Sequence, residues 1–145
     1  MEPIVLDTSI TMAWCFEDEA VPYTEELLNW CAAGTTVYVA SIWPLEVTNV
    51  LLNAQKKGRV NEKQVEEFLD VLLHLPIQVE PVFSEHAFQD IRKLAQAHRL
   101  TSYDAAYLEL AIRRRLPLAS LDTDLKKAAN ATGVKLVTLP PSSQP

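Results

Sequence analysis

The sequence alternates short apolar runs with longer segments of helical periodicity, and this alternation restricts the possible fold more than any other feature. Apolar runs of this length are typical of buried strands, and they occupy residues 4–6, 37–40, 77–82, 118–121 and 135–137. Strands that alternate with helices pair in parallel through right-handed crossovers. The sequence therefore predicts an α/β fold, a three-layer α/β/α sandwich around a central parallel sheet of about four to five strands.

The segments between these runs carry helix start and stop signals. Asp7, Thr8 and Ser9 directly follow the first run and are N-cap residue types, while Gly34, Gly58 and Gly133 end helical patterns. The run at 77–82 alternates polar and apolar residues and contains a proline, so we expect it near an edge of the sheet. The helices that we expect lie over residues 25–33, 44–58, 61–73, 84–98, 101–112 and 123–131.

The length of 145 residues suits one domain, which we place at residues 1–139. Residues 140–145 are rich in Pro and Ser and are expected to form a flexible C-terminal tail. No apolar stretch approaches the roughly 20 residues that span a bilayer, and the N-terminus carries no secretory signal. Cys15 and Cys31 lack metal or redox spacing, so we expect reduced thiols in a cytoplasmic protein without a membrane partner.

The net charge of −6 argues against a protein that merely coats nucleic acid. It does not exclude an enzyme that cuts nucleic acid, because a local positive rim steers a polyanion even on an acidic molecule. Basic residues are clustered at 56–59, 92–99 and 113–115. Taken singly, each cluster is typical of a solvated helix end, since cations favour helix C-termini.

Four acidic residues occupy positions where their charge is costly. Asp7 ends the first apolar run and Asp122 follows the run at 118–121, while Glu46 and Asp104 fall early in helical segments beside core positions. In open parallel α/β sheets the ligand crevice lies at the carboxyl ends of the strands, so we expect these side chains to converge there. At a separation of about 4 Å and an effective dielectric near 20, each like-charge pair costs roughly 4 kcal/mol. A divalent cation is the simplest compensation.

Each acid also has a local explanation. Asp104 and Glu46 are acids in a first helical turn, where they interact favourably with the helix dipole. Asp122 suits a helix N-cap, and Asp7 suits a turn. Each explanation is adequate by itself. Together they require four coincidences, because all four acids lie at the ends of strands and helices that we expect to converge.

An all-carboxylate site indicates a hard cation. Mg²⁺ and Mn²⁺ take oxygen ligands and keep several waters, and in phosphodiester cleavage such ions activate water and stabilise the attacking and leaving oxygens. Thr8, Ser9 and Ser120 are suited to hydrogen-bond a carboxylate or a phosphate oxygen. None of the three histidines belongs to this set.

The chain resembles a PIN-domain ribonuclease, specifically a VapC-type toxin of a VapBC toxin–antitoxin pair. The resemblance extends from residue 4 to about 139, and it is carried by four motifs in series, at residues 5–9, 43–51, 104–111 and 118–122. No single motif is specific, whereas the series is. The resemblance implies a PIN-like α/β/α sandwich.

The resemblance also implies roles for the four acids. Asp7 matches the family's first acid, a direct metal ligand. Glu46 matches the acid that opens the helix after the second strand and reaches the metal through water. Asp104 matches a ligand that positions the attacking water, and Asp122 matches the acid of a Thr-x-Asp element.

Three further positions belong to the same comparison. Ser9 matches a hydroxyl that supports the site, and Ser120 stands where the family usually has Thr; both are candidate substrate-binding residues. The hydroxyl survives at Ser120, so we expect this departure to have a small effect. Asp124 is an additional acid whose role the resemblance leaves open.

The function implied is that of a metal-dependent endoribonuclease, the toxin of a type II toxin–antitoxin system, holding one or two Mg²⁺ or Mn²⁺ ions. The implied partners are an RNA substrate, a second copy in a homodimer, and a VapB-type antitoxin whose C-terminal segment fills the groove. In such pairs the antitoxin supplies the DNA-binding domain, so we expect no direct specific DNA binding by this chain.

The main alternative is a catalytically silent PIN-like module that binds nucleic acid or protein. A phosphoacceptor receiver domain is a weaker alternative, because residues 82–84 and 137–139 supply neither the acceptor Asp nor the Lys that it needs. A haloacid-dehalogenase-like phosphatase needs a second Asp two residues after Asp7, and Ser9 occupies that position.

Overall fold

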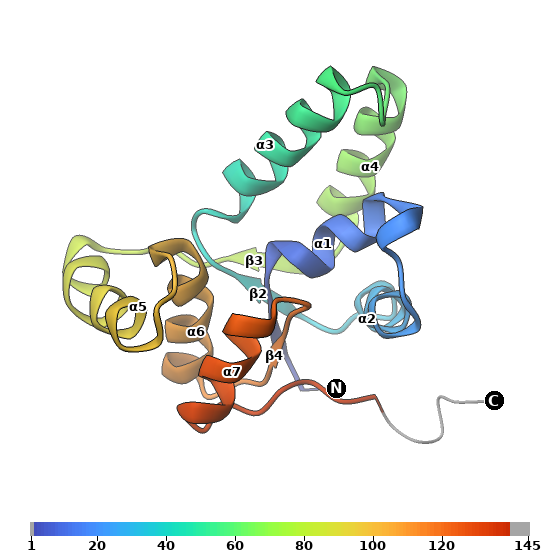
Figure 1. Ribbon diagram of the computed structural model, residues 1–145. Coiled ribbons are helices and arrows are strands. Elements are labelled where there is room, and N and C mark those ends of the chain that lie inside the picture. Colours follow the sequence, from blue (N-terminus) through green and yellow to red (C-terminus); the bar gives the residue numbers. More distant parts are fainter. Residues whose placement is uncertain (1, 140–145) are drawn as a thin grey trace.

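The computed structural model describes residues 2–139 and confirms the parallel α/β fold (Figure 1). The sheet has the order β3-β2-β1-β4, and all its neighbouring strands are parallel. The third strand lies at an edge, as its alternating sequence predicts. The expected C-terminal tail, residues 140–145, lies outside the described residues. The strands are β1 (Ile4–Leu6), β2 (Val37–Val39), β3 (Ile77–Val79) and β4 (Leu118–Ala119).

The fourth and fifth apolar runs are less regular than expected. The strand β4 ends at Ala119 instead of continuing to residue 121, because the side chain of Ser120 accepts the backbone N–H of Asp122 and turns the chain. The run at 135–137 forms one isolated parallel bridge, between Leu118 and Leu136. The sheet therefore has four strands and a single added bridge.

Helices cover both faces of the sheet (Figure 1). Right-handed crossovers place the helices of the first two connections on one face and the later helices on the other. The first group comprises α1 (Thr8–Cys15), the 3₁₀ helix η1 (Glu17–Glu19), α2 (Pro22–Ala32), α3 (Trp43–Lys56) and α4 (Glu62–His74). The second comprises the π-helix η2 (His86–Ile91), α5 (Arg92–His98), α6 (Ser102–Arg114) and α7 (Thr123–Ala131). The helix predicted over residues 84–98 is thus partly π-helical.

The core is built around β1 and α6. The three residues of β1 are buried, and every residue from 105 to 111 is buried in α6, because this helix contacts the sheet, α5 and α7. A polar residue at such a position needs a partner. The buried Glu109 receives one from Arg113, whose Nε lies 2.9 Å from Oε2. No helix within residues 2–139 is both long and apolar enough to cross a bilayer.

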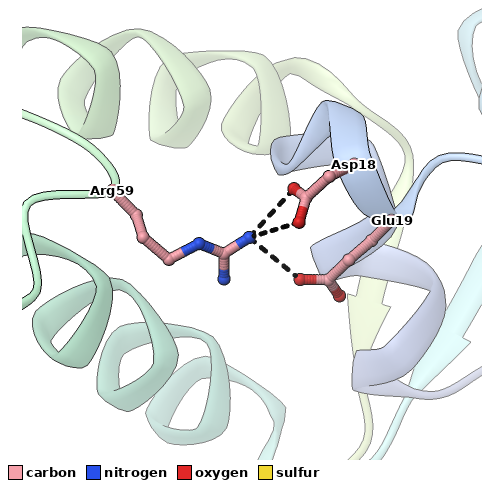
Figure 2. A network of polar contacts seen from close by, with 3 residues as sticks. All are labelled: Asp18, Glu19 and Arg59. Atoms are coloured by element: carbon pink, nitrogen blue, oxygen red, sulfur yellow. Dashed lines mark hydrogen bonds and ion pairs between the residues drawn. The ribbon is translucent and has the colours of Figure 1, made fainter.

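An arginine fastens the turn between α3 and α4 to η1 (Figure 2). One nitrogen of Arg59 lies 2.9 Å from Asp18 Oδ1 and 3.5 Å from Glu19 Oε2. The guanidinium also lies over the ring of Phe16, 4.1 Å from its centroid. Both acids are exposed, so this contact joins two surface elements and is not part of the core.

A second arginine joins the end of β3 to the end of α6. Arg114 forms an ion pair with Glu80, and its guanidinium lies over the ring of Tyr38, 4.0 Å from the centroid. Both cysteines, Cys15 and Cys31, are free thiols, in agreement with the prediction.

Candidate active site

The predicted acids lie where the direction of the chain across the sheet reverses. From β1 the chain passes outward to β2 and β3, and it then returns to the opposite side of β1 to form β4. Such a reversal leaves a crevice at the carboxyl ends of the two strands that flank it, here β1 and β4. Asp7 directly follows β1, and Asp122 follows β4 after a short turn. Glu46 lies in the first turn of α3, and Asp104 in the first turn of α6.

Asp7 is buried and held by two serine hydroxyls. Ser9 donates to Oδ1 at 2.5 Å, and Ser120 donates to Oδ2 at 2.6 Å. Each serine oxygen also accepts a backbone N–H from the turn after β4, from Leu121 at Ser9 and from Asp122 at Ser120, both at 2.9 Å. The carboxylate therefore fastens the β1–α1 junction to the β4–α7 turn.

The buried position makes the charge of Asp7 unfavourable. Its side chain is 4% exposed, and burial raises the pKa of Asp7 to about 6. The hydrogen bonds from Ser120, Ser9 and the Ile10 N–H oppose this rise, while the charge of Asp104 adds to it. The effect of burial outweighs that of the hydrogen-bond donors, so the Asp7 carboxyl takes up a proton at a higher pH than an exposed aspartate does.

Glu46 is held by a different pair of hydroxyls. Tyr107 donates to Oε1 at 2.6 Å, and Thr8 donates to the same oxygen at 2.8 Å. The two hydroxyl oxygens are 3.0 Å apart. Burial, followed by the hydrogen bond to Glu46, raises the pKa of Tyr107. The phenol is therefore a neutral donor.

Tyr107 is the residue that sequence analysis missed. It is 1% exposed and lies one turn after Asp104 in α6, among alanine and leucine side chains. A buried tyrosine usually needs a hydrogen-bond partner for its hydroxyl. The sequence could have pointed to Tyr107 for this reason, because it lies on the buried face of the helix that carries Asp104. The sequence could not show that its partner is Glu46.

Asp104 is the acid whose pKa is raised by the charges of the other acids in the crevice. Burial raises the pKa of Asp104, and the charges of Asp122, Glu46 and Asp124 raise it further, while the hydrogen bond with Thr101 lowers it. The three charges that raise it all belong to carboxylates. Asp124, whose role the sequence left open, is exposed, but its charge acts on this cluster.

The comparison with known proteins identifies the family. Residues 4–131 match the family described as the PIN domain. This chain belongs to the PIN-domain family. The family match and the sheet topology confirm the resemblance and the fold predicted from the sequence. No curated protein is detectably similar in sequence.

Two solved structures share the fold of this PIN domain. The structure of PAE2754 from Pyrobaculum aerophilum has 18% sequence identity and a TM-score of 0.64, and the alignment covers 87% of this chain and 84% of that one. The structure of FitAcB from Neisseria gonorrhoeae has 22% identity and a TM-score of 0.55, with 93% and 96% covered. At these identities the likeness concerns the fold alone.

The local explanations for the acids are correct but incomplete. Asp7 is the N-cap of α1 and Asp122 is the N-cap of α7, where its Oδ1 accepts the Leu125 N–H at 2.8 Å. Asp104 and Glu46 are first-turn acids. Capping uses only one carboxylate oxygen, however, and explains neither the burial of Asp7 nor the repulsion between the acids at Asp104.

The donor set fits a hard divalent cation. Its ligands are carboxylate oxygens whose charges raise the pKa of Asp104, and a bound cation would relieve that repulsion. Mg²⁺ commonly uses one or two protein carboxylates and keeps several waters, so it does not require that all the acids converge. Within residues 2–139 no three acidic, histidine or cysteine side chains already form a ligand cluster around one point.

Proposed function

We propose that this PIN-domain protein is a metal-dependent endoribonuclease, the VapC-type toxin of a type II toxin–antitoxin system. PIN domains are in general nucleases, and this chain belongs to that family. The single observation that supports the activity is the group of carboxylates in the crevice, where the charges of Asp122, Glu46 and Asp124 raise the pKa of Asp104.

The proposed site assigns one task to each acid. Asp7 and Asp104 would hold Mg²⁺ or Mn²⁺ directly, Asp122 would complete the site, and Glu46 would act through water. When bound, the ion supplies charge stabilisation at the phosphate and lowers the pKa of water. Asp104 would also orient the attacking water, and such positioning contributes to the rate because the reacting atoms are held in place.

Ser9 and Ser120 remain proposed substrate-binding residues. Their hydroxyl hydrogens are directed at Asp7, so we propose that they act on the phosphate mainly by fixing the Asp7 carboxylate. The oxygen ligand of the ion is then in place before RNA arrives, and such preorganisation contributes to catalysis because it avoids reorganisation during the reaction.

The biological setting is proposed from the same family resemblance. It comprises a single domain over residues 1–139, a homodimer, a cytoplasmic location and a VapB-type antitoxin that carries the DNA-binding function. The nature of the RNA depends on the shape of its loops and single strands, since specific RNA recognition mostly targets such regions.

The test is cleavage of total cellular RNA by the purified protein with Mg²⁺, with Mn²⁺ and with EDTA. We expect discrete metal-dependent fragments that are absent with Asp7→Asn. Asp18→Asn is the matched control, because Asp18 is an acid outside the crevice, paired with Arg59, and it should cleave like the wild type.

Identical lanes for the wild type and Asp7→Asn would contradict the nuclease, provided that a mass spectrum of the preparation shows no copurified antitoxin. That result would favour the alternative, a silent PIN-like module that binds nucleic acid or protein. An antitoxin in the spectrum would instead require its removal before the assay is repeated.

A further inference from the structure

We propose that Tyr107 is a positioning residue for Glu46, which it holds together with Thr8 so that one carboxylate oxygen is directed to the metal site. The proposal rests on the proposed metal site and adds a residue outside the set of acids. Both hydroxyls converge on Oε1. Within residues 2–139 the other oxygen, Oε2, forms no hydrogen bond, so it is available to an ion or to its water.

The position of Tyr107 suits this task. The ring is packed in the core and 1% exposed, so the hydroxyl has little freedom to move. Its helix, α6, also carries Asp104 one turn earlier. The same rigid element therefore presents one acid and orients another, Glu46, which is 61 residues away in sequence and on a helix from the opposite face of the sheet.

Thr8 makes the arrangement specific. Thr8 and Tyr107 have one hydroxyl hydrogen each, and their oxygens lie 3.0 Å apart. When both hydrogens are directed at Oε1, the three oxygens form a triangle in which Glu46 is the common acceptor. If the carboxylate rotated away, one hydroxyl could donate to the other, but the second would lose its acceptor in a partly buried site, which is unfavourable.

A neutral donor serves an ion site better than an arginine. An arginine beside Glu46 would compensate its negative charge and compete with a metal ion. Hydroxyls orient the carboxylate but leave its charge uncompensated. Other acids near α6 do have arginine partners, Glu109 with Arg113 and Glu80 with Arg114. Residues that orient metal ligands typically change metal affinity or activity by about 10–100-fold when they are replaced.

The first experiment measures Mn²⁺ binding to the full chain by calorimetry, without RNA. We expect Tyr107→Phe to raise the dissociation constant by about 10-fold or more. The matched control is Tyr23→Phe, because Tyr23 also donates a hydroxyl hydrogen bond, to the Val137 carbonyl at 2.8 Å, but does not contact Glu46. Its dissociation constant should stay within about 2-fold of the wild type. Equal binding by Tyr107→Phe and the wild type would overturn the proposal.

A double variant separates positioning from packing. If Tyr107 acts through Glu46, Tyr107→Phe should have little further effect on Mn²⁺ binding in a Glu46→Ala background. An undiminished effect there would show that the phenol acts through the core. Thr8→Val, which removes the other hydroxyl at constant shape, should weaken binding in the same direction, and Thr8→Ser should restore it.

A metal-free measurement keeps this proposal separate from the proposed function. In the absence of metal, Tyr107→Phe should lower the melting temperature less in the Glu46→Ala background than in the wild type, because the contact is already gone. Equal losses in both backgrounds would contradict the contact itself. A wild type that binds Mn²⁺ but cleaves no RNA would refute the nuclease alone and leave the positioning of Glu46 to be decided by the binding data.

Discussion

Two groups of acids in this protein differ in their partners. Four acids outside the crevice pair with arginines: Asp18 and Glu19 with Arg59, Glu109 with Arg113 and Glu80 with Arg114. In the crevice, the partners of Glu46 are hydroxyls, and those of Asp7 are two hydroxyls and the Ile10 N–H. The charges that raise the pKa of Asp104 come from other acids.

This difference in partners separates acids that contribute to ion pairs in the fold from acids that keep an uncompensated charge. An arginine neutralises an acid and satisfies its lone pairs at the same time. A hydroxyl orients the acid but leaves its charge uncompensated, which costs stability in a buried site. Among the described residues, Asp7 and Glu46 have no ion pair with an arginine or lysine, as a site for a cation requires.

The largest expected effect comes from breaking the crevice group at Asp104. We expect Asp104→Asn to reduce cleavage by roughly 10²-fold or more, because a metal ligand that orients the attacking water is lost, and to preserve or raise the melting temperature, because repulsion from the other acids falls. Cleavage rates and thermal melts of the same preparation test both halves. Normal turnover by this variant would remove Asp104 from the mechanism.

The second prediction concerns the pH dependence of stability without metal. The folded pKa of Asp7, about 6, lies above its unfolded value of 3.8, so the folded state binds the proton more tightly. The free energy of unfolding should therefore rise as the pH falls through about 6 and level off below about 4, with a total contribution from Asp7 of about 3 kcal/mol.

Urea unfolding at a series of pH values measures this contribution. In Asp7→Asn the rise between neutral pH and about pH 5 should be largely lost, because the titrating group is gone. An unchanged rise in that variant would assign the effect to other groups.

The third prediction concerns the effect of a divalent cation on stability. Mg²⁺ or Mn²⁺ at about 100 times its dissociation constant should stabilise the fold by about 2.7 kcal/mol, which corresponds to a rise in melting temperature of roughly 5–10 °C for a domain of this size. The rise should be lost in Asp104→Asn and kept in Asp18→Asn. A wild type whose melting temperature does not respond at millimolar metal would contradict a preformed site.

The smallest expected effect comes from breaking an arginine pair. Arg59→Met removes two exposed ion pairs and the contact with the Phe16 ring, and we expect a loss of about 1 kcal/mol in the free energy of unfolding. Metal-dependent cleavage should be unchanged, because Arg59 lies outside the crevice. A strong loss of cleavage at unchanged stability would contradict the division between the two groups of acids.

Much of the fold could be predicted because short sequence patterns, namely apolar runs and helix caps, indicate where strands and helices begin and end. The runs at 4–6 and 37–40 are apolar enough to identify strands, and the caps Asp7, Asn61 and Thr101 begin the helices that they were expected to begin. The prediction was wrong on the length of β4, since Ser120 leaves the ladder to hydrogen-bond the turn and Asp7. A hydroxyl that prefers a side-chain partner to the strand ladder is not visible in hydrophobic periodicity.

The order of strands and helices and the four acids at their ends could be predicted from the sequence, because hydrophobic periodicity and helix capping act over a few residues. Which hydroxyl holds which acid is apparent only in the folded protein. Neighbouring Thr8 and Ser9 serve different carboxylates, Ser120 meets Asp7 across 113 positions, and Tyr107 meets Glu46 across 61. The packing of α6 and β4 against β1 brings these partners together. Their separation along the chain does not indicate how far apart they lie in the folded protein.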